Sequence, residues 1–209
     1  MTLLAVDTAL GACSVAILDG GRVRAHRCEA MDRGHAEALA PMVADAMADA
    51  GIAFAALDRL AVTTGPGTFT GQRVGLAFMR GLRVALHRPL IGVTTLAAML
   101  AQALAQTGLS RAAALHDARR GEVYLQISDD GEPAVLPFED ALGQLGGVLA
   151  LAGTAAPAAA ARLPHAVLSD VRQPDALWVG RLAHALPDTQ VAPRPLYLRA
   201  PDAKLPAPR

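Results

Sequence analysis

The sequence predicts an α/β fold built of two lobes, the second smaller and degenerate. Two observations lead to this prediction. Short apolar runs rich in strand formers alternate with longer segments whose apolar residues recur at three- and four-residue spacing. A strand meander opens the chain, and a second strand pair starts near Ala112. A chain of 209 residues suffices for one large domain or two small ones, and it buries about 70% of its unfolded surface.

The first lobe opens with three predicted strands. Residues 3–8 have the pattern of a buried strand, and residues 14–18 form a second one after a bend at Gly11. Asp19-Gly20-Gly21 supplies the positive φ angles of a hairpin turn, so residues 23–28 are predicted to be the third strand. The lobe therefore begins as an antiparallel meander.

Alternating helices and strands complete the first lobe. They are predicted, in order, as a helix over residues 35–50, a strand over 57–63, a helix over 70–86, a strand over 90–93 and a helix over 96–105. Gly51 ends the first helix, and Thr94 or Thr95 is suited to cap the last one. This order matches the ribonuclease-H-like unit from which actin-like ATPases are built. The first lobe is predicted to span residues 1–105.

The second lobe is predicted over residues 106–209 and is harder to interpret. Its expected elements are a strand pair over 112–116 and 122–128, a strand over 146–151, an Ala-rich stretch over 155–161 of undecided structure, and a helix capped by Asp175. A Pro-rich segment over 187–195 leads to an extended tail over 196–199, which is expected to pack back on the body.

Composition and charge limit the classes of function. The chain is 53% hydrophobic, has nineteen basic and nineteen acidic residues, and is only 3% aromatic, so any RNA contact is expected to be shared with a partner. Its two cysteines show no CxxC spacing. We find no signal peptide pattern and no apolar run of the roughly 20 residues that a membrane span requires. The expected location is the cytoplasm.

The clearest local motif is the glycine-rich turn over residues 64–71, between a predicted strand and a helix. Glycines allow close backbone approach, and helix N–H groups favour an anion, so Gly65, Gly67 and Thr68 are candidate nucleotide-binding residues. Asp7, at the end of the first strand, is a further candidate. The turn is not a P-loop, because Lys204 is the only lysine in the chain. A tight connection that packs the helix close to the sheet remains an equal alternative.

The first two helices carry more apolar surface than one sheet contact explains, which predicts a partner helix. Glycines in the second helix each cost about 1 kcal/mol relative to Ala and suggest close helix approach. The alternative places both apolar stripes in one core. The candidate partner-binding residues are Leu39, Met42, Val43, Met47, Gly71, Val74, Gly75, Phe78 and Leu82.

No catalytic or metal-binding residue is predicted. The six histidines include no pair at i, i+3 or i, i+4 spacing, and Ser14 lies outside a Gly-x-Ser-x-Gly elbow. His116 and Asp117 are suited to a polar cleft, although neighbours on a strand point to opposite faces.

Several motifs, taken together, resemble the TsaB (YeaZ) family over nearly the whole chain. They are Asp7-Thr8, the His35 to Pro41 stretch, the Gly65 to Gly75 block, Asp117-Ala118-Arg119-Arg120-Gly121-Glu122-Val123-Tyr124 and Pro195-Leu196-Tyr197-Leu198-Arg199. The resemblance implies a non-catalytic assembly subunit of the bacterial complex that forms N6-threonylcarbamoyladenosine in tRNAs reading ANN codons. It implies TsaD and TsaE as partners, with tRNA bound only through the complex and with ATP and metal held by TsaD and TsaE.

The same resemblance implies a role for the first two helices and a reason for the lack of a metal site. Thr95 and Met99 stand where the catalytic paralogue TsaD has its His-x-x-x-His metal pair. The first two helices are expected to form a four-helix bundle with TsaD, or to pair as a homodimer in isolation. The alternatives are an autonomous actin-like ATPase or small-molecule kinase and, ranked lower, a metallopeptidase.

Overall fold

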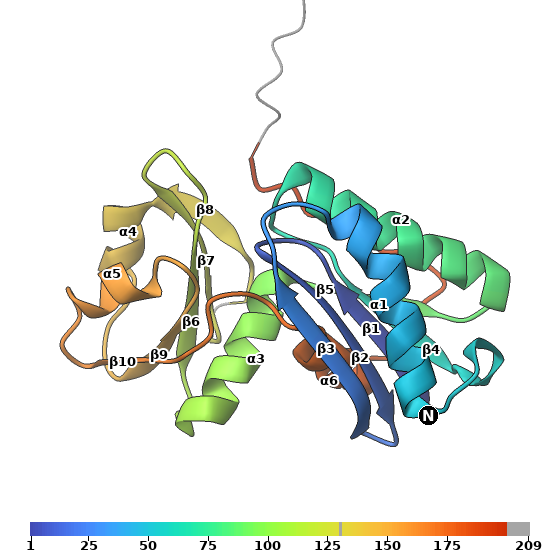
Figure 1. Ribbon diagram of the computed structural model, residues 1–209. Helices are drawn as coiled ribbons and strands as arrows, with labels where there is room; N and C mark the ends of the chain where they lie inside the picture. The colour runs from blue at the N-terminus through green and yellow to red at the C-terminus, as the bar shows by residue number, and fades with distance from the viewer. Residues whose placement is uncertain (130, 200–209) are drawn as a thin grey trace, which may run out of the picture.

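The computed structural model describes residues 1–129 and 131–199 and contains two five-stranded sheets, one in each lobe (Figure 1). The first sheet has the strand order β3-β2-β1-β4-β5. Its strands are β1 Thr2–Asp7, β2 Ala12–Asp19, β3 Arg22–Ala30, β4 Arg59–Thr63 and β5 Leu90–Val93. The first three strands are antiparallel and the last two run parallel to β1, so the predicted meander is confirmed.

Helices α1 (His35–Ala50) and α2 (Phe69–Leu86) cover one face of this sheet. Apolar side chains of both helices pack on Leu4, Val6 and Ile17, which all point to that face because strand side chains alternate. The predicted stop at Gly51 is confirmed, since its φ of 65° is left-handed and its N–H binds the carbonyls of Met47 and Ala48.

The opposite face of the first sheet is covered by α6 (Ala176–Ala185), and α3 (Thr95–Thr107) packs beside α6 with Ala97 and Ala98 in the same hydrophobic cluster. Both predicted caps are present, because the side chains of Thr94 and Asp175 accept hydrogen bonds from backbone N–H groups in the first turn of each helix. Helix α6 comes late in the sequence but returns to the first sheet, since Leu3, Ala5 and Leu18 would otherwise lie open to water.

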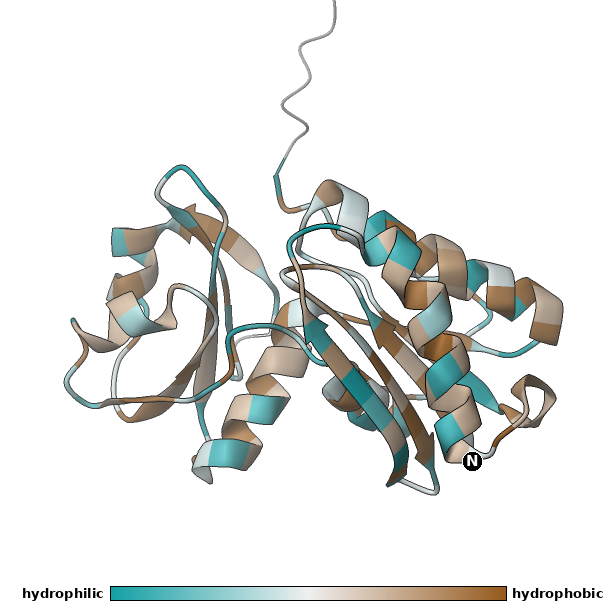
Figure 2. Cartoon of the chain, in the orientation of Figure 1, coloured by the Kyte–Doolittle hydropathy of each residue, from teal (hydrophilic) through white to brown (hydrophobic). Residues whose placement is uncertain are grey.

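The predicted lobe boundary at residues 105/106 stays a prediction. The return of α6 to the first sheet nevertheless differs from the placement of residues 176–199 in the second lobe. Helix α3 lies between the lobes, where it packs on the second sheet and on α6 (Figure 1). Figure 2 shows the apolar residues concentrated along the strands of the two sheets.

The second sheet has the order β10-β9-β6-β7-β8. Its strands are β6 Ala112–Asp117, β7 Glu122–Ile127, β8 Ala134–Pro137, β9 Leu149–Ala152 and β10 Ala166–Leu168, with short helices α4 Phe138–Gly143 and α5 Ala156–Ala160 on one face. The strand pair β6–β7 is confirmed, and the undecided Ala-rich stretch contains α5. Strands β8 and β10 and helix α4 were not predicted, because segments of three to six residues carry little periodicity.

Candidate functional site

A cleft of about 630 Å³ opens between the two lobes. The first lobe, the second lobe and the returning C-terminal segment all contribute to its wall. The lining residues are Leu10, Gly11, Asp32, Gly67, Thr68, His116, Asp117, Ala118, Arg119, Tyr124, Thr154, Gln173 and Arg199. His116 and Asp117 both reach the cleft, since they lie at the end of β6 where the strand gives way to a turn.

The glycine-rich turn packs tightly on the bend that joins β1 to β2. The N–H of Thr68 donates a 2.8 Å hydrogen bond to the carbonyl of Ala9, and the N–H of Gly71 donates to Thr68 Oγ1 at 3.1 Å. A Cβ on Gly67 would lie 2.4 Å from the Ala9 carbonyl oxygen, which no side chain allows. Two of the N–H groups that would face a phosphate are therefore used within the chain.

Asp7 is completely buried and lies outside the lining of the cleft. Its Oδ1 accepts hydrogen bonds from Thr63 Oγ1 at 2.6 Å and from the N–H of Ala9 at 3.2 Å, while Oδ2 has no partner. Burial raises the pKa of Asp7 to about 7, against the lowering effect of these two hydrogen bonds. A carboxyl group in this position is half protonated near neutral pH.

The four candidate nucleotide-binding residues thus do not form one open site. Gly67 and Thr68 line the cleft, whereas Asp7 and Gly65 do not. Gly65 has a φ of 107° and lies against the side chain of Gln72. In this arrangement the residues do not fit the phosphates and hydrated metal of an actin-like ATPase, and their role in nucleotide binding stays a prediction.

His116 is the most perturbed base of the cleft. It is 7% exposed, and its Nδ1 has no hydrogen-bond partner. Burial lowers the pKa of His116 to about 4, in spite of the nearby carboxylate of Asp117. The ring is therefore neutral at physiological pH.

Most of the candidate partner-binding residues lie inside the chain's own core. Leu39, Met42, Val43 and Met47 are at most 5% exposed and face the first sheet. Gly71 and Gly75 are buried against Thr8, and a Cβ on either would lie within 2.7 Å of a Thr8 oxygen. The burial of these six residues agrees with the alternative interpretation, in which both apolar stripes belong to one core. Val74, Phe78 and Leu82 are half-buried at its margin.

A different set of residues faces outward on the same two helices. We define the outer face as the exposed small residues Ala40, Ala44 and Ala48 of α1 and Ala77, Gly81 and Ala85 of α2. Each set repeats every four residues, so it forms one stripe along its helix. A Cβ on Gly81 would meet no atom within 4 Å, so internal packing does not explain this glycine.

The positions matched to the metal pair of TsaD are buried. Thr95 and Met99 are 0% exposed, and Thr95 Oγ1 donates a 2.6 Å hydrogen bond to the carbonyl of Pro66. Within residues 1–129 and 131–199, no three His, Cys, Asp or Glu residues lie close enough to hold a metal ion. No helix in this part of the chain is long and apolar enough to cross a membrane.

Sequence patterns gave no sign of several cleft residues. Thr154 and Gln173 come from loops without a motif, and only the fold brings them beside Gly11 and Asp117. Arg199 belongs to a segment that the sequence marked as an extended tail and as a family motif, but not as part of a cleft. These residues are distant in sequence, so no local spacing connects them.

Comparisons with known proteins define the class. A family model described as TsaD: tRNA N6-adenosine threonylcarbamoyltransferase matches residues 28–203. The solved structure of YeaZ from Pseudomonas aeruginosa superposes with a TM-score of 0.79 at 34% identity, covering 94% of this chain and 99% of that one. Component A of (R)-2-hydroxyglutaryl-CoA dehydratase from Acidaminococcus fermentans has a TM-score of 0.55 at 9% identity, over 87% and 97% of the two chains, and shows the fold alone.

Two curated relatives extend the comparison. The tRNA threonylcarbamoyladenosine biosynthesis protein TsaB of Escherichia coli is 43% identical over 124 residues, or 59% of this chain, and the match spans about half (53%) of that relative's length. An uncharacterised protein of Mycobacterium tuberculosis is 37% identical over 210 residues, covering 97% of this chain and 94% of the relative.

Two lobes, each with a mixed sheet and flanking helices, make this a protein of the actin-like ATPase fold. Within that fold the chain belongs to the TsaB (YeaZ) family.

Proposed function

We propose that this chain is a non-catalytic subunit of the complex that makes N6-threonylcarbamoyladenosine in tRNA, and that it binds a TsaD subunit through the outer face of α1 and α2. The names of its relatives supply the pathway. The outer face is the structural observation that supports docking, because two adjacent stripes of small residues let partner helices approach closely.

Features of the chain's interior favour a non-catalytic role in the complex over an enzymatic one. The glycine turn is closed by Ala9 and Thr68, and Asp7 is buried behind it. Thr95 and Met99 offer no imidazole to a metal. The chain is therefore proposed to need no cofactor of its own, with ATP and metal belonging to TsaD and TsaE. We expect it to act in the cytoplasm and to meet tRNA only within the complex.

Co-elution with the TsaD of the same organism tests the docking face. Ala44→Arg and Gly81→Arg each place a long charged side chain on the outer face without entering the core. Both variants should keep the circular dichroism and melting temperature of the parent chain and lose co-elution. The matched control is Val148→Arg, at a side chain that is 60% exposed on the second lobe. Undisturbed co-elution of both outer-face variants would refute the proposed face.

The pathway assignment needs its own measurement. Formation of the modified nucleoside in a mixture of TsaD, TsaE, ATP, bicarbonate, threonine and tRNA should depend on adding this chain. Size-exclusion chromatography of the chain alone tests the homodimer, which should be lost in Gly81→Arg if the same face is used. The competing ATPase or kinase function predicts ATP turnover by the purified chain that disappears in Asp7→Ala.

A further inference from the structure

The segment that follows α6 is extended and crosses the molecule from one lobe to the other. We define residues 187–199 as the strap. Three prolines, Pro187, Pro193 and Pro195, have no backbone N–H, and no helix or strand follows α6 up to residue 199. The carbonyl groups of such a segment need donors from elsewhere in the protein.

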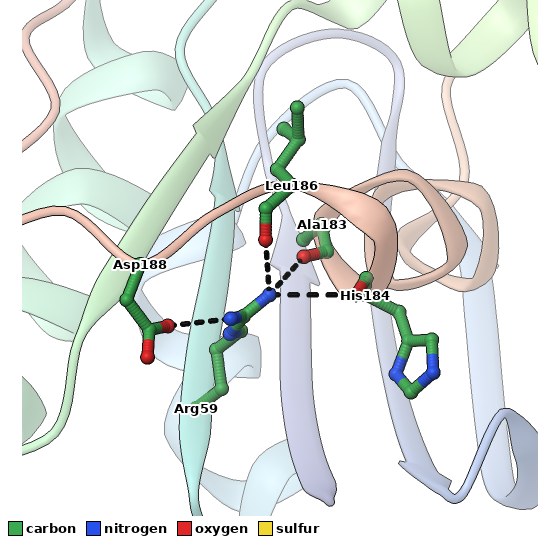
Figure 3. A network of polar contacts seen from close by, with 5 residues as sticks. All are labelled: Arg59, Ala183, His184, Leu186 and Asp188. Carbon is green, nitrogen blue, oxygen red and sulfur yellow. Dashed lines mark hydrogen bonds and ion pairs between the residues drawn. The ribbon is translucent and has the colours of Figure 1, made fainter.

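Arginine side chains of the first lobe supply many of these donors. Arg59 on β4 binds the carbonyl of Leu186 at 2.7 Å and the carboxylate of Asp188 at 2.5 Å (Figure 3). On α2, Arg83 donates to the carbonyl of Gln190 at 2.7 Å, and Arg80 donates to the carbonyl of Pro193. The N–H of Leu196 in turn donates to the carbonyl of Thr64 at 2.7 Å.

Aromatic contacts hold the next part of the strap at the amino end of α2. The rings of Tyr197 and Phe69 stack with centroids 6.1 Å apart. Arg73 lies 3.5 Å above the Phe69 ring and donates a 3.0 Å hydrogen bond to the Tyr197 hydroxyl. The first lobe therefore binds the strap at points from Asp188 to Tyr197.

Arg199 then reaches the second lobe. Its Nη1 donates to the carbonyl of Ala118 at 3.0 Å, and its Nη2 forms an ion pair with Glu122. These two partners flank the β6–β7 turn, in which Arg119, Arg120 and Gly121 all have left-handed φ angles between 58° and 75°. Ala118 and Arg119 line the cleft, so Arg199 fixes one wall of the cleft to a segment anchored on the opposite lobe.

We propose that the strap is an interlobe latch, in which the contacts of Arg199 with Ala118 and Glu122 hold the cleft at its observed opening. Among the residues that the structure describes, Arg199 joins the anchored strap to the second lobe. Breaking this link leaves α3 and the segment that carries Gln173 as the described connections between the lobes, so the second lobe can move about α3 while both sheets stay folded.

Distance measurement between spin labels on the two lobes tests the latch in the full chain. The labels are placed at Val23 on β3 and Val148 before β9, which are both exposed and lie outside the outer face, after replacing the native thiols by Cys13→Ala and Cys28→Ser. The parent chain should give one narrow distance distribution. Arg199→Glu should broaden it and shift it, since two carboxylates then face each other.

A charge swap and a matched control show whether the lost contacts of Arg199 cause the change in the distance distribution. Arg199→Glu combined with Glu122→Arg should restore the narrow distribution. Arg194→Glu changes the charge of an exposed residue in the same strap and should leave the distribution unchanged. Should Arg199→Glu fail to fold, Glu122→Gln is the second variant, and it should broaden the distribution too. A distribution unchanged by these substitutions, or not restored by the swap, overturns the proposal.

Discussion

The side chain of Thr8 and the backbone of Gly71 are in direct contact, since Thr8 Oγ1 donates a 2.7 Å hydrogen bond to the Gly71 carbonyl. A Cβ on Gly71 would lie 2.2 Å from the Thr8 carbonyl oxygen. Helix α2 is therefore held against the end of β1 at a distance that only glycine permits. Gly71 and Gly75, which looked suited to a partner, serve the chain's own packing.

This contact predicts opposite effects for two glycines of one helix. Gly71→Ala should destabilise the fold by about 3 kcal/mol, because the clash is with backbone that cannot yield easily. Gly81→Ala, with open space around its Cβ, should stabilise it by up to about 1 kcal/mol through helix propensity. Urea denaturation compares the two, and equal effects would contradict the assigned roles.

Asp7→Asn should stabilise the chain relative to the parent, and the difference in the free energy of unfolding should grow as pH rises. Asp7 has a pKa of about 7 in the folded chain and 3.8 as its ordinary value, so the folded state keeps a proton that the unfolded state releases. The buried carboxyl therefore lowers the free energy of unfolding by up to about 4 kcal/mol as pH rises from about 4 to 7. Denaturation series from pH 4 to 8 should show the gap between variant and parent growing up to pH 7. A constant gap would contradict the raised pKa.

His116 should have the opposite pH dependence. Its folded pKa of about 4 lies below the ordinary value of 6.5, so the unfolded state binds a proton between these values and the folded state does not. Stability should fall by up to about 3 kcal/mol as pH drops from 6.5 to 4. The ring signals of His116 in NMR should stay those of neutral imidazole down to pH 5. His116→Gln should remove this part of the acid sensitivity, which Asp7 partly offsets in the parent chain.

Arg59→Met should loosen α6 from the first sheet. The Arg59 side chain is 8% exposed and donates to the carbonyls of Ala183 and Leu186, which would lose their partner in the variant. We expect a loss of about 3 kcal/mol. Fluorescence of Trp178, the only tryptophan of the chain and part of α6, reports the change. Arg88→Met, at a half-buried arginine with one long hydrogen bond to the Ala55 carbonyl, should change stability by no more than about 1 kcal/mol.

Sequence alone determined the elements that local pattern encodes. Strands with clear alternation or apolar runs, helices with long periodicity, and caps such as Asp175 depend on neighbouring residues, and they were predicted correctly. The family motifs are local too, so the sequence by itself shows the resemblance to the TsaB family.

Tertiary structure decided which surface each residue occupies. Periodicity shows that Met42 and Met47 share a helix face, but only the sheet beneath α1 shows that this face is buried. The same holds for Asp7, whose environment is set by Thr63 from β4, and for Arg199, whose partners lie 77 and 81 positions away. Burial and long-range hydrogen bonds depend on chain folding in three dimensions, which no sequence spacing records.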